Sequence, residues 1–329
     1  MSPRPVVAVS RRGLPEEVLR RLTGVAEVRA WPGEVPPSPA ELAELVRGCA
    51  ALLAMGDDRI DAALLAAAGP GLRVVALASM GYDSLDVAAA AAAGVTATHT
   101  PSVLAETTAD LTFALILMAR RRLRVAAAAL HAGRWAATRP GDLFGLDVHG
   151  ARLGVLGYGQ IGQAVARRAV GFGMTVVHVD HTRPSDGVSR AVDLDELVTT
   201  SDVLSVHVPL TPANRGLVGR DLLARMKPTA TLVNTSRGGV VDEAALLEAL
   251  AAGRLHSAGL DVMEREPRTD PADALLTDER LVVLPHVGSA TEATRTAMAD
   301  LAARNIAEVL SGRPAPTPIR GTPALPHRS

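Results

Sequence analysis

The chain has 329 residues, a formal net charge of −1 at pH 7, 48 % hydrophobic residues and 21 % charged residues. These values are typical of a globular protein of about two domains, and the evenly mixed charges exclude the basic face of a nucleic-acid binder. A single cysteine, Cys49, rules out an internal disulfide and a thiolate metal cluster, so we expect a reducing, cytoplasmic setting and no metal site. No signal-peptide core is visible, and the longest uncharged run, 87–105, contains Gly94 and Pro101, so we expect no membrane partner.

The first hundred residues alternate short apolar runs with stretches rich in Ala and Leu. We expect strands at 6–9, 50–53, 73–77 and 95–98, and helices at 15–22, 39–46, 61–68 and 85–93. Alternation of this kind indicates a parallel sheet with helices on its faces.

One long helix is expected at 106–131, followed by an irregular segment at 133–150. A second alternating block has expected strands at 153–156, 175–179, 203–207, 231–234, 257–261 and 281–285. A last helix at 291–310 precedes a proline-rich tail, 313–329, which we expect to be flexible or to lie on the surface. The two blocks predict an α/β protein of two doubly wound parallel-sheet, Rossmann-like domains.

The strongest motif is a G-x-G-x-x-G run between a strand and a helix expected at 163–170, consisting of Gly157, Tyr158, Gly159, Gln160, Ile161 and Gly162. Gly157 permits a tight turn, Gly159 lets the backbone approach a pyrophosphate, and Gly162 lets the helix pack close to the strand. The positive end of the helix then faces the phosphates. The run therefore predicts a dinucleotide site rather than an ordinary glycine turn.

The next strand ends at Asp180, 18 residues after Gly162. A carboxylate there can accept hydrogen bonds from the ribose 2′-OH and repel a 2′-phosphate, which favours NAD(H). Arg183 follows closely and could pair with a 2′-phosphate, so NADP(H) stays open.

Three side chains with complementary chemistry follow successive strands, namely Arg237, Glu266 and His286. Ligands bind at the carboxyl ends of strands in open α/β sheets. Arginine offers a two-pronged contact to a carboxylate, and histidine can donate a proton near neutral pH. A glutamate bonded to the histidine would favour imidazolium. These are the requirements for reducing a 2-oxo acid.

Each residue alone is as well explained by a solvated arginine, a packed histidine or a surface carboxylate. Their occurrence at successive strand ends behind a dinucleotide motif favours a site. A hydrolase is disfavoured because neither Ser236 nor Ser289 lies in a G-x-S-x-G turn.

At these residues the chain resembles the D-isomer-specific 2-hydroxyacid dehydrogenases, and most of all their glyoxylate reductase/hydroxypyruvate reductase branch. The resemblance covers about residues 5–315 and rests on the motifs at 157–162, 207–212, 234–238, 258–267 and 285–291. It implies a substrate (flavodoxin-like) domain formed by 1–102 plus 292–329, with the dinucleotide-binding domain, 103–291, inserted into it. It also implies a cleft closing by a hinge, and a homodimer with the helical region 106–131 near the two-fold axis.

The resemblance also implies residue roles. Arg237 binds substrate, His286 is the acid/base and Glu266 orients His286. Substrate contacts are Ser79, Met80, Gly81, Arg237 and Ser289, where Gly81 permits a sharp turn that presents backbone N–H groups to an anion. Cofactor contacts are Thr108, the 157–162 run, Asp180, His207, Pro209, Thr235, Asp261, His286 and Gly288.

The expected activity is NAD(P)H-dependent reduction of glyoxylate or hydroxypyruvate to the D-2-hydroxy acid. A bulkier 2-oxo acid stays open because Met80 is larger than the valine often found there. Formate dehydrogenases of the superfamily carry Gln where Glu266 stands, which disfavours that activity. A non-catalytic NAD(H)-sensing protein is the other alternative, although its partner surface would have only the Arg120–Arg124 run, which we interpret as a solvated or inter-subunit helix face.

Overall fold

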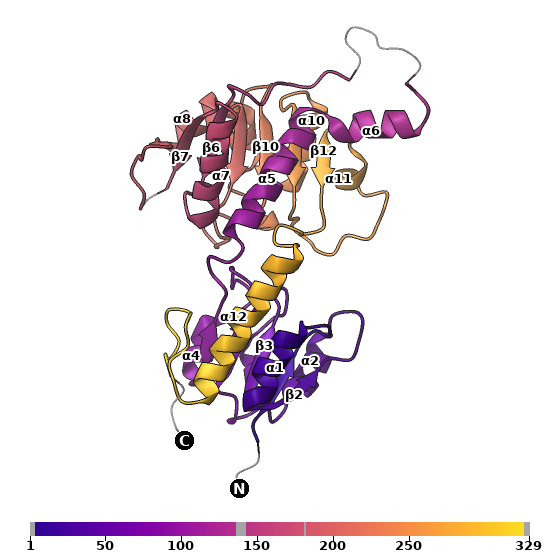
Figure 1. Cartoon of the computed structure of the whole chain (residues 1–329). Helices are drawn as coiled ribbons and strands as arrows, with labels where there is room; N and C mark the ends of the chain where they lie inside the picture. The colour runs from indigo at the N-terminus through magenta and orange to yellow at the C-terminus, as the bar shows by residue number, and fades with distance from the viewer. Residues whose placement is uncertain (1–3, 136–142, 181, 326–329) are drawn as a thin grey trace. The chain divides into compact units, whose positions relative to one another are not determined.

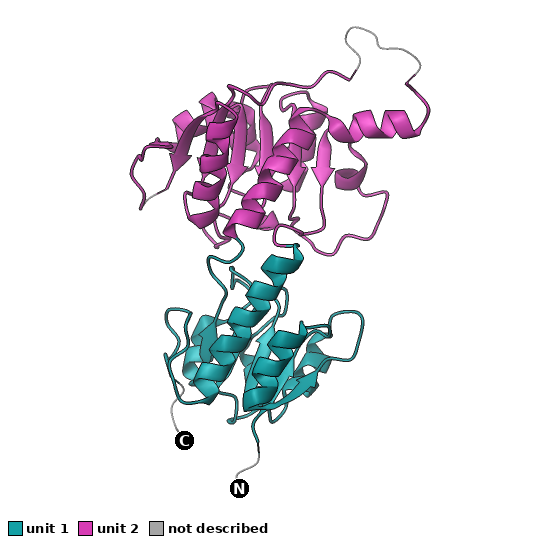
Figure 2. Ribbon diagram, viewed as in Figure 1, with its two compact units in different colours: residues 1–104, 290–329 teal, residues 105–289 magenta. Residues whose placement is uncertain are grey.

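The computed structural model describes residues 4–135, 143–180 and 182–325, which form two compact units (Figures 1 and 2). Unit 1 comprises 1–104 and 290–329, and unit 2 comprises 105–289, so unit 2 interrupts unit 1 in the sequence. Every strand pair in both sheets is parallel, which confirms the expected α/β class. In the part of the chain that is described, no helix is long and apolar enough to cross a membrane.

Unit 1 is a five-stranded sheet with the order β2-β1-β3-β4-β5, the flavodoxin-like order. Its strands are β1 (Val6–Val9), β2 (Glu27–Ala30), β3 (Ala51–Ala54), β4 (Val74–Leu77) and β5 (Thr96–Thr98). Its helices are α1 (Glu16–Val25), α2 (Pro39–Val46), α3 (Ala62–Ala68), α4 (Val87–Ala92) and α12 (Glu292–Leu310). α12 lies beside α1 and over β3 and β4 (Figure 1), so the end of the chain completes the core of the first unit.

Strand β2 was not expected from the sequence. Its residues Glu27–Ala30 are mostly exposed and include two charged side chains, so no apolar run marks it. It pairs with β1 along Val6–Val9 at the edge of the sheet. An edge strand needs only backbone partners on one side, and these come from the tertiary fold.

The proline-rich tail is fastened to unit 1 through its described part. Pro318 pairs with Thr98, the Ile319 side chain is 2 % exposed, and Asn305 Nδ2 donates to Thr317 Oγ1 at 2.8 Å. The tail therefore lies on the surface along β5, while residues 326–329 lie outside the described residues.

Unit 2 is a seven-stranded sheet with the order β12-β11-β10-β9-β6-β7-β8. Its strands are β6 (Arg152–Leu156), β7 (Thr175–Val179), β8 (Arg190–Ala191), β9 (Val203–Val206), β10 (Thr231–Asn234), β11 (Ser257–Leu260) and β12 (Leu281–Val283). Its helices are α5 (Ala105–Arg120), α6 (Leu123–His131), α7 (Gln160–Gly171), α8 (Leu194–Thr200), α9 (Arg220–Arg225), α10 (Glu243–Ala251) and α11 (Ala274–Thr277). Strand order reverses between β6 and β9, and ligands of such sheets bind at that point.

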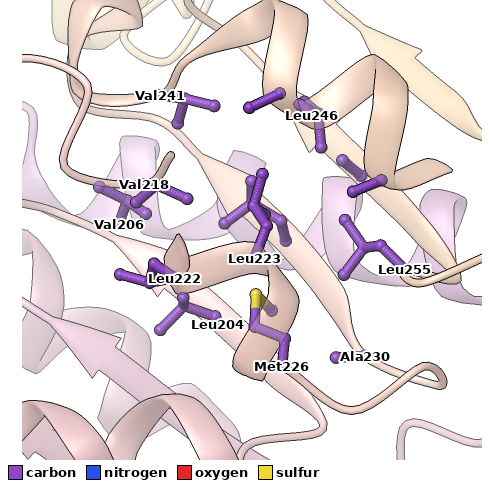
Figure 3. Close-up of a cluster of buried hydrophobic side chains, with 14 of the residues drawn as sticks. Leu204, Val206, Val218, Leu222, Leu223, Met226, Ala230, Val241, Leu246 and Leu255 are labelled. Atoms are coloured by element: carbon purple, nitrogen blue, oxygen red, sulfur yellow. The ribbon is translucent and has the colours of Figure 1, made fainter. Parts of the chain in front are cut away.

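The core of unit 2 is aliphatic, as its sequence requires. Figure 3 shows Leu204 and Val206 of β9 meeting Leu222 and Leu223 of α9, with Leu246 of α10 nearby. Burying one Leu or Val side chain contributes about 1.5–3 kcal/mol, so this cluster holds α9 and α10 firmly on the sheet. The loops at the carboxyl edge of the sheet are therefore attached to firmly packed strands and helices.

The prediction of one long helix at 106–131 is wrong in one respect, because the structure has two helices there, α5 and α6. Arg122 adopts a left-handed conformation at φ +53°. The break lets Arg120, 6 % exposed, donate to the carbonyl groups of Asp147, Asp202 and Thr229, while Arg124 donates to carbonyl groups near α11 and β12. Arg120 and Arg124 therefore tie segments of unit 2 together, which corrects their interpretation as solvated residues, whereas Arg121 of the same run is exposed.

Candidate active site

The glycine run occupies the point where the strand order of unit 2 reverses. Gly157 has φ +95°, and a Cβ there would lie 2.8 Å from the carbonyl carbon of His207, after β9. A Cβ on Gly162 would lie 2.2 Å from the Gly157 oxygen, so the helix can begin this close to the strand only with glycine at that position. Helix α7 begins at Gln160, earlier than the sequence indicated, and Ile161 and Gly162 lie in its first turn.

This loop fits a dinucleotide pyrophosphate. A Cβ on Gly159 would meet no protein atom within 4 Å, and no side chain caps α7, so the positive end of the helix faces open space. Beside it, burial lowers the pKa of His207 to about 3, and its Nδ1 is buried without a partner in the described residues. Its Nε2 bonds Ser205 Oγ at 2.7 Å. The neutral ring therefore leaves one polar atom for a ligand.

Asp180 stands at the end of β7, next to the glycine run. Its Oδ2 accepts the N–H of Tyr158 at 3.1 Å, and its Oδ1 accepts the N–H and Oγ1–H of Thr182, both at 2.8 Å. Partial burial raises the pKa of Asp180, but these hydrogen bonds lower it more, and the pKa lies below its ordinary value. The carboxylate is thus ionised and fixed in direction, while the Arg183 side chain is exposed.

The three residues expected to carry the chemistry all lie in unit 2, at its carboxyl edge. Nδ1–H of His286 donates to Oε2 of Glu266 at 2.8 Å, and Oε1 of Glu266 accepts the N–H of Met263 at 2.7 Å. The bond to Glu266 raises the pKa of His286 above its ordinary value. Partial burial raises the pKa of Glu266, but the bonds from His286 and Met263 lower it further. The pair therefore favours imidazolium beside carboxylate.

Asp261 fixes the turn that presents His286. The histidine adopts φ +53°, an uncommon conformation for a residue with a side chain. Its N–H donates to the Asp261 carbonyl at 2.9 Å, and the N–H groups of Val287 and Gly288 donate to the Asp261 carboxylate at 2.8 and 2.7 Å. Burial raises the pKa of Asp261, despite these two bonds. The strained turn is thus held by three hydrogen bonds to one residue.

Arg237 follows β10 and is positioned by a residue that sequence reasoning missed as part of the site. Asn234 is fully buried, its Nδ2 donates to the Arg237 carbonyl at 3.0 Å, and its Oδ1 accepts from the N–H and Oγ of Ser236. An asparagine at the end of a strand is a known turn former, and that signal was available in the sequence.

The remaining cofactor and substrate candidates of unit 2 include residues of α5 and of the loops after its strands. Thr108 Oγ1 donates to the Gly288 carbonyl at 3.2 Å, and Thr235 Oγ1 lies 3.0 Å from Thr112 Oγ1. The Pro209 carbonyl accepts from Asn214 Nδ2 at 2.6 Å, and Ser289 is half-buried. Thr108 is thereby tied to the His286 turn.

The expected substrate loop lies in unit 1, after β4. Its three carbonyl groups all accept protein hydrogen bonds: that of Ser79 from Thr100 N–H, that of Met80 from His99 Nδ1–H, and that of Gly81 from Ser79 Oγ. The N–H groups of Met80 and Gly81 donate to no protein acceptor among the described residues. The loop therefore presents two donors suited to an anion. His99 is a second residue that the sequence analysis did not single out.

The comparisons agree with this geometry. Residues 113–288 match the family described as D-isomer specific 2-hydroxyacid dehydrogenase, NAD binding domain. The glyoxylate reductase of Korarchaeum cryptofilum is 44 % identical over 309 residues, 92 % of either chain. A Thermus thermophilus protein of known structure is 44 % identical with a TM-score of 0.90, over 95 % of this chain and 99 % of that one. The NADPH-dependent glyoxylate/hydroxypyruvate reductase of Sinorhizobium meliloti, solved with NADP and malonate, is 34 % identical with a TM-score of 0.85, over 99 % and 100 %.

Proposed function

The chain belongs to the D-isomer-specific 2-hydroxyacid dehydrogenase family of NAD(P)-dependent oxidoreductases, and we propose that it reduces glyoxylate and hydroxypyruvate to the D-2-hydroxy acids in the cytoplasm. The observation that carries the proposal is the 2.8 Å bond between His286 and Glu266 at the same sheet edge as the glycine run and Arg237. The names of the relatives supply the two candidate substrates.

The proposed reaction divides its requirements among residues of unit 2. Bound nicotinamide supplies the hydride. Arg237 binds the substrate carboxylate and polarises the carbonyl group, as its planar fork of donors allows. His286 donates the proton from Nε2 to the carbonyl oxygen, since Nδ1–H stays bonded to Glu266. Glu266 stabilises the charged ring before transfer and keeps its orientation afterwards.

The cofactor is proposed to lie along the glycine run. Gly157 to Gly162 and the start of α7 would hold the pyrophosphate, and Thr108, His207, Pro209, Thr235, Asp261 and Gly288 would surround the nicotinamide half. Asp180 would accept from the ribose hydroxyl groups, which supports NADH over NADPH. The Sinorhizobium relative is NADPH-dependent. If this chain preferred NADPH, Arg183 would be the residue proposed to bind the 2′-phosphate.

Unit 1 is proposed as the substrate domain and unit 2 as the dinucleotide-binding domain. In unit 1 the N–H groups of Met80 and Gly81 would bind the substrate carboxylate, with Ser79 shaping the loop. Ser289, at the end of unit 2, is proposed as a further substrate contact.

The test is a parallel set of initial rates with NADH and NADPH on glyoxylate, hydroxypyruvate, pyruvate and phenylpyruvate. Fast NADH oxidation with the two small acids is expected. Turnover of phenylpyruvate alone would point to a dehydrogenase for bulkier acids. Tight NADH binding without turnover of any of the four acids would contradict the proposed enzymatic activity and favour a cofactor-sensing protein.

A homodimer is proposed as the assembly. No residue of α6 is buried, and Leu123 and Leu130 are 44 % and 56 % exposed, with Phe144 of the following segment 67 % exposed. Exposed large apolar side chains are typical of surfaces covered by a second copy. Sedimentation velocity on the wild type and on Leu130→Glu would decide, because the dimer predicts a shift of the variant to monomer.

A further inference from the structure

Glu243 is the first residue of α10, and its carboxylate faces the loop that carries Glu266. The side chain is only 12 % exposed. Its Oε1 accepts the N–H of Glu264 at 2.6 Å, and its Oε2 pairs with the guanidinium of Arg268. One carboxylate therefore holds the chain two residues before and two residues after Glu266.

Arg268 completes the clamp. Its side chain is 16 % exposed and also pairs with Asp273, the residue that caps α11. Its Nε is buried with no partner in the part of the chain that the structure describes. Such buried ion pairs add little to the free energy of unfolding, but removing one partner leaves the other charge buried and unpaired, which is destabilising. The pair is therefore better explained by the geometry that it imposes on the loop.

The opposite side of the loop is held by close packing. A Cβ on Gly238, next to Arg237, would lie 1.9 Å from the carbonyl carbon of Met263 and 2.4 Å from the nitrogen of Glu264. The peptide between Met263 and Glu264 thus lies between Gly238 and Glu243. The N–H of Met263, which belongs to the preceding peptide, donates to Glu266 Oε1, so fixing Met263 in this way also restricts the carboxylate.

We propose that Glu243 and Arg268 are positioning residues that hold Glu266 against His286 and so set the acid strength of the histidine. The inference rests on the proposed function, in which His286 donates the proton. Neither residue is hydrogen-bonded to His286. The charged groups that act on the ring are Glu266, Arg237 and Asp261. Glu243 and Arg268 act through the loop.

The experiment compares full-length wild type with Arg268→Leu and Arg268→Lys. The readouts are the NMR titration of the His286 ring, assigned from the spectrum of His286→Gln, the pH profile of kcat, and NADH affinity by fluorescence. Arg190→Leu is the matched control, because Arg190 pairs with Glu196 on the surface of the same unit. Thermal unfolding shows that each variant is folded.

Loss of the clamp is expected to lower the pKa of His286 by about one unit in Arg268→Leu and to reduce kcat about tenfold, with NADH affinity within about twofold of the wild type. Lysine at position 268 keeps the positive charge and can pair with one of the two carboxylates. The pKa of His286 and the kcat of Arg268→Lys should therefore lie between those of the wild type and those of Arg268→Leu. Arg190→Leu should match the wild type.

The sign of the shift separates positioning from simple charge. Removing a cation by itself would raise the pKa of a nearby histidine, whereas loosening Glu266 lowers it. A raised or unchanged pKa with unchanged kcat in both Arg268 variants would overturn the inference and leave the proposed function standing. A wild type without turnover would defeat the proposed function, while the NMR titration would still test the clamp. If Arg268→Leu fails to fold, Arg268→Lys decides alone.

Discussion

The Nδ1 atom of His286 and the Oε2 atom of Glu266 lie 2.8 Å apart, in a strand-end turn where the histidine backbone is left-handed. The contact occupies one ring nitrogen and leaves Nε2 to meet a substrate. It also raises the pKa of His286, so that the proton-donating form persists to higher pH than it would in an isolated side chain.

The substitution Glu266→Gln should move the pH profile of the reductive reaction. Because the protonated ring is the active form, the rate is full below the pKa of His286 and is lost as pH rises through it. Glutamine keeps the shape but removes the anion that raises this pKa, so the basic limb of kcat/KM should move to lower pH by about one unit or more. Glu264→Gln, a nearby exposed carboxylate, is the control. A basic limb that stays in place would show that another group controls it.

The substitution Gly162→Ala should damage the cofactor loop. Its Cβ would lie 2.2 Å from the Gly157 oxygen, so the strand and helix must separate. Overpacking of this kind costs about 1–3 kcal/mol of unfolding free energy, and NADH should bind at least about tenfold more weakly. Gly171→Ala in the same helix meets nothing within 4 Å, so it should keep the NADH affinity and should not lower the unfolding free energy. Urea unfolding and fluorescence titration measure them, and equal behaviour of the two variants would refute the packing role.

The substitution Asp180→Ser should weaken NADH binding and improve NADPH binding. The carboxylate is ionised and directed by Tyr158 and Thr182, so it repels a 2′-phosphate and accepts from a 2′-hydroxyl. The ratio of kcat/KM for NADPH over NADH should rise at least about tenfold, the usual worth of a charged hydrogen bond. Asp195→Ser, on the exposed face of α8, serves as the control. If the ratio does not change, Asp180 has no part in cofactor choice.

The substitution Gly56→Ala should disturb the loop of unit 1. A Cβ there would lie 2.9 Å from the Ser79 Cβ, so the loop bearing Met80 and Gly81 must move. We expect KM for the 2-oxo acid to rise about tenfold while NADH affinity is kept, since the cofactor residues belong to unit 2. Gly71→Ala, which meets nothing within 4 Å, is the matched control in unit 1. A weaker NADH affinity with an unchanged KM would argue against this loop as the substrate contact.

Local patterns in the sequence determined most of the fold. Strands β7 and β10 occupy the predicted residues because each has a short apolar centre, a local pattern that needs no distant information. The glycine run marked its own turn, because Gly157 has a positive φ and a Cβ on Gly162 would lie 2.2 Å from the Gly157 oxygen within the same run. Arg237, Glu266 and His286 were marked by their places after successive strands, and the common direction of parallel strands gathers such residues at one edge.

Only the tertiary structure decided the features that depend on distant partners. Strand β2 exists because β1 offers it a backbone ladder. The helix break at Arg122 comes with hydrogen bonds from Arg120 and Arg124 to carbonyl groups far along the chain. Likewise Glu243 and Arg268 support the site through contacts that sequence spacing does not reveal. The sequence by itself determined which chemistry stands at the sheet edge, because that depends on local pattern. How firmly each group is held depends on hydrogen bonds between segments, which form only when the chain has folded.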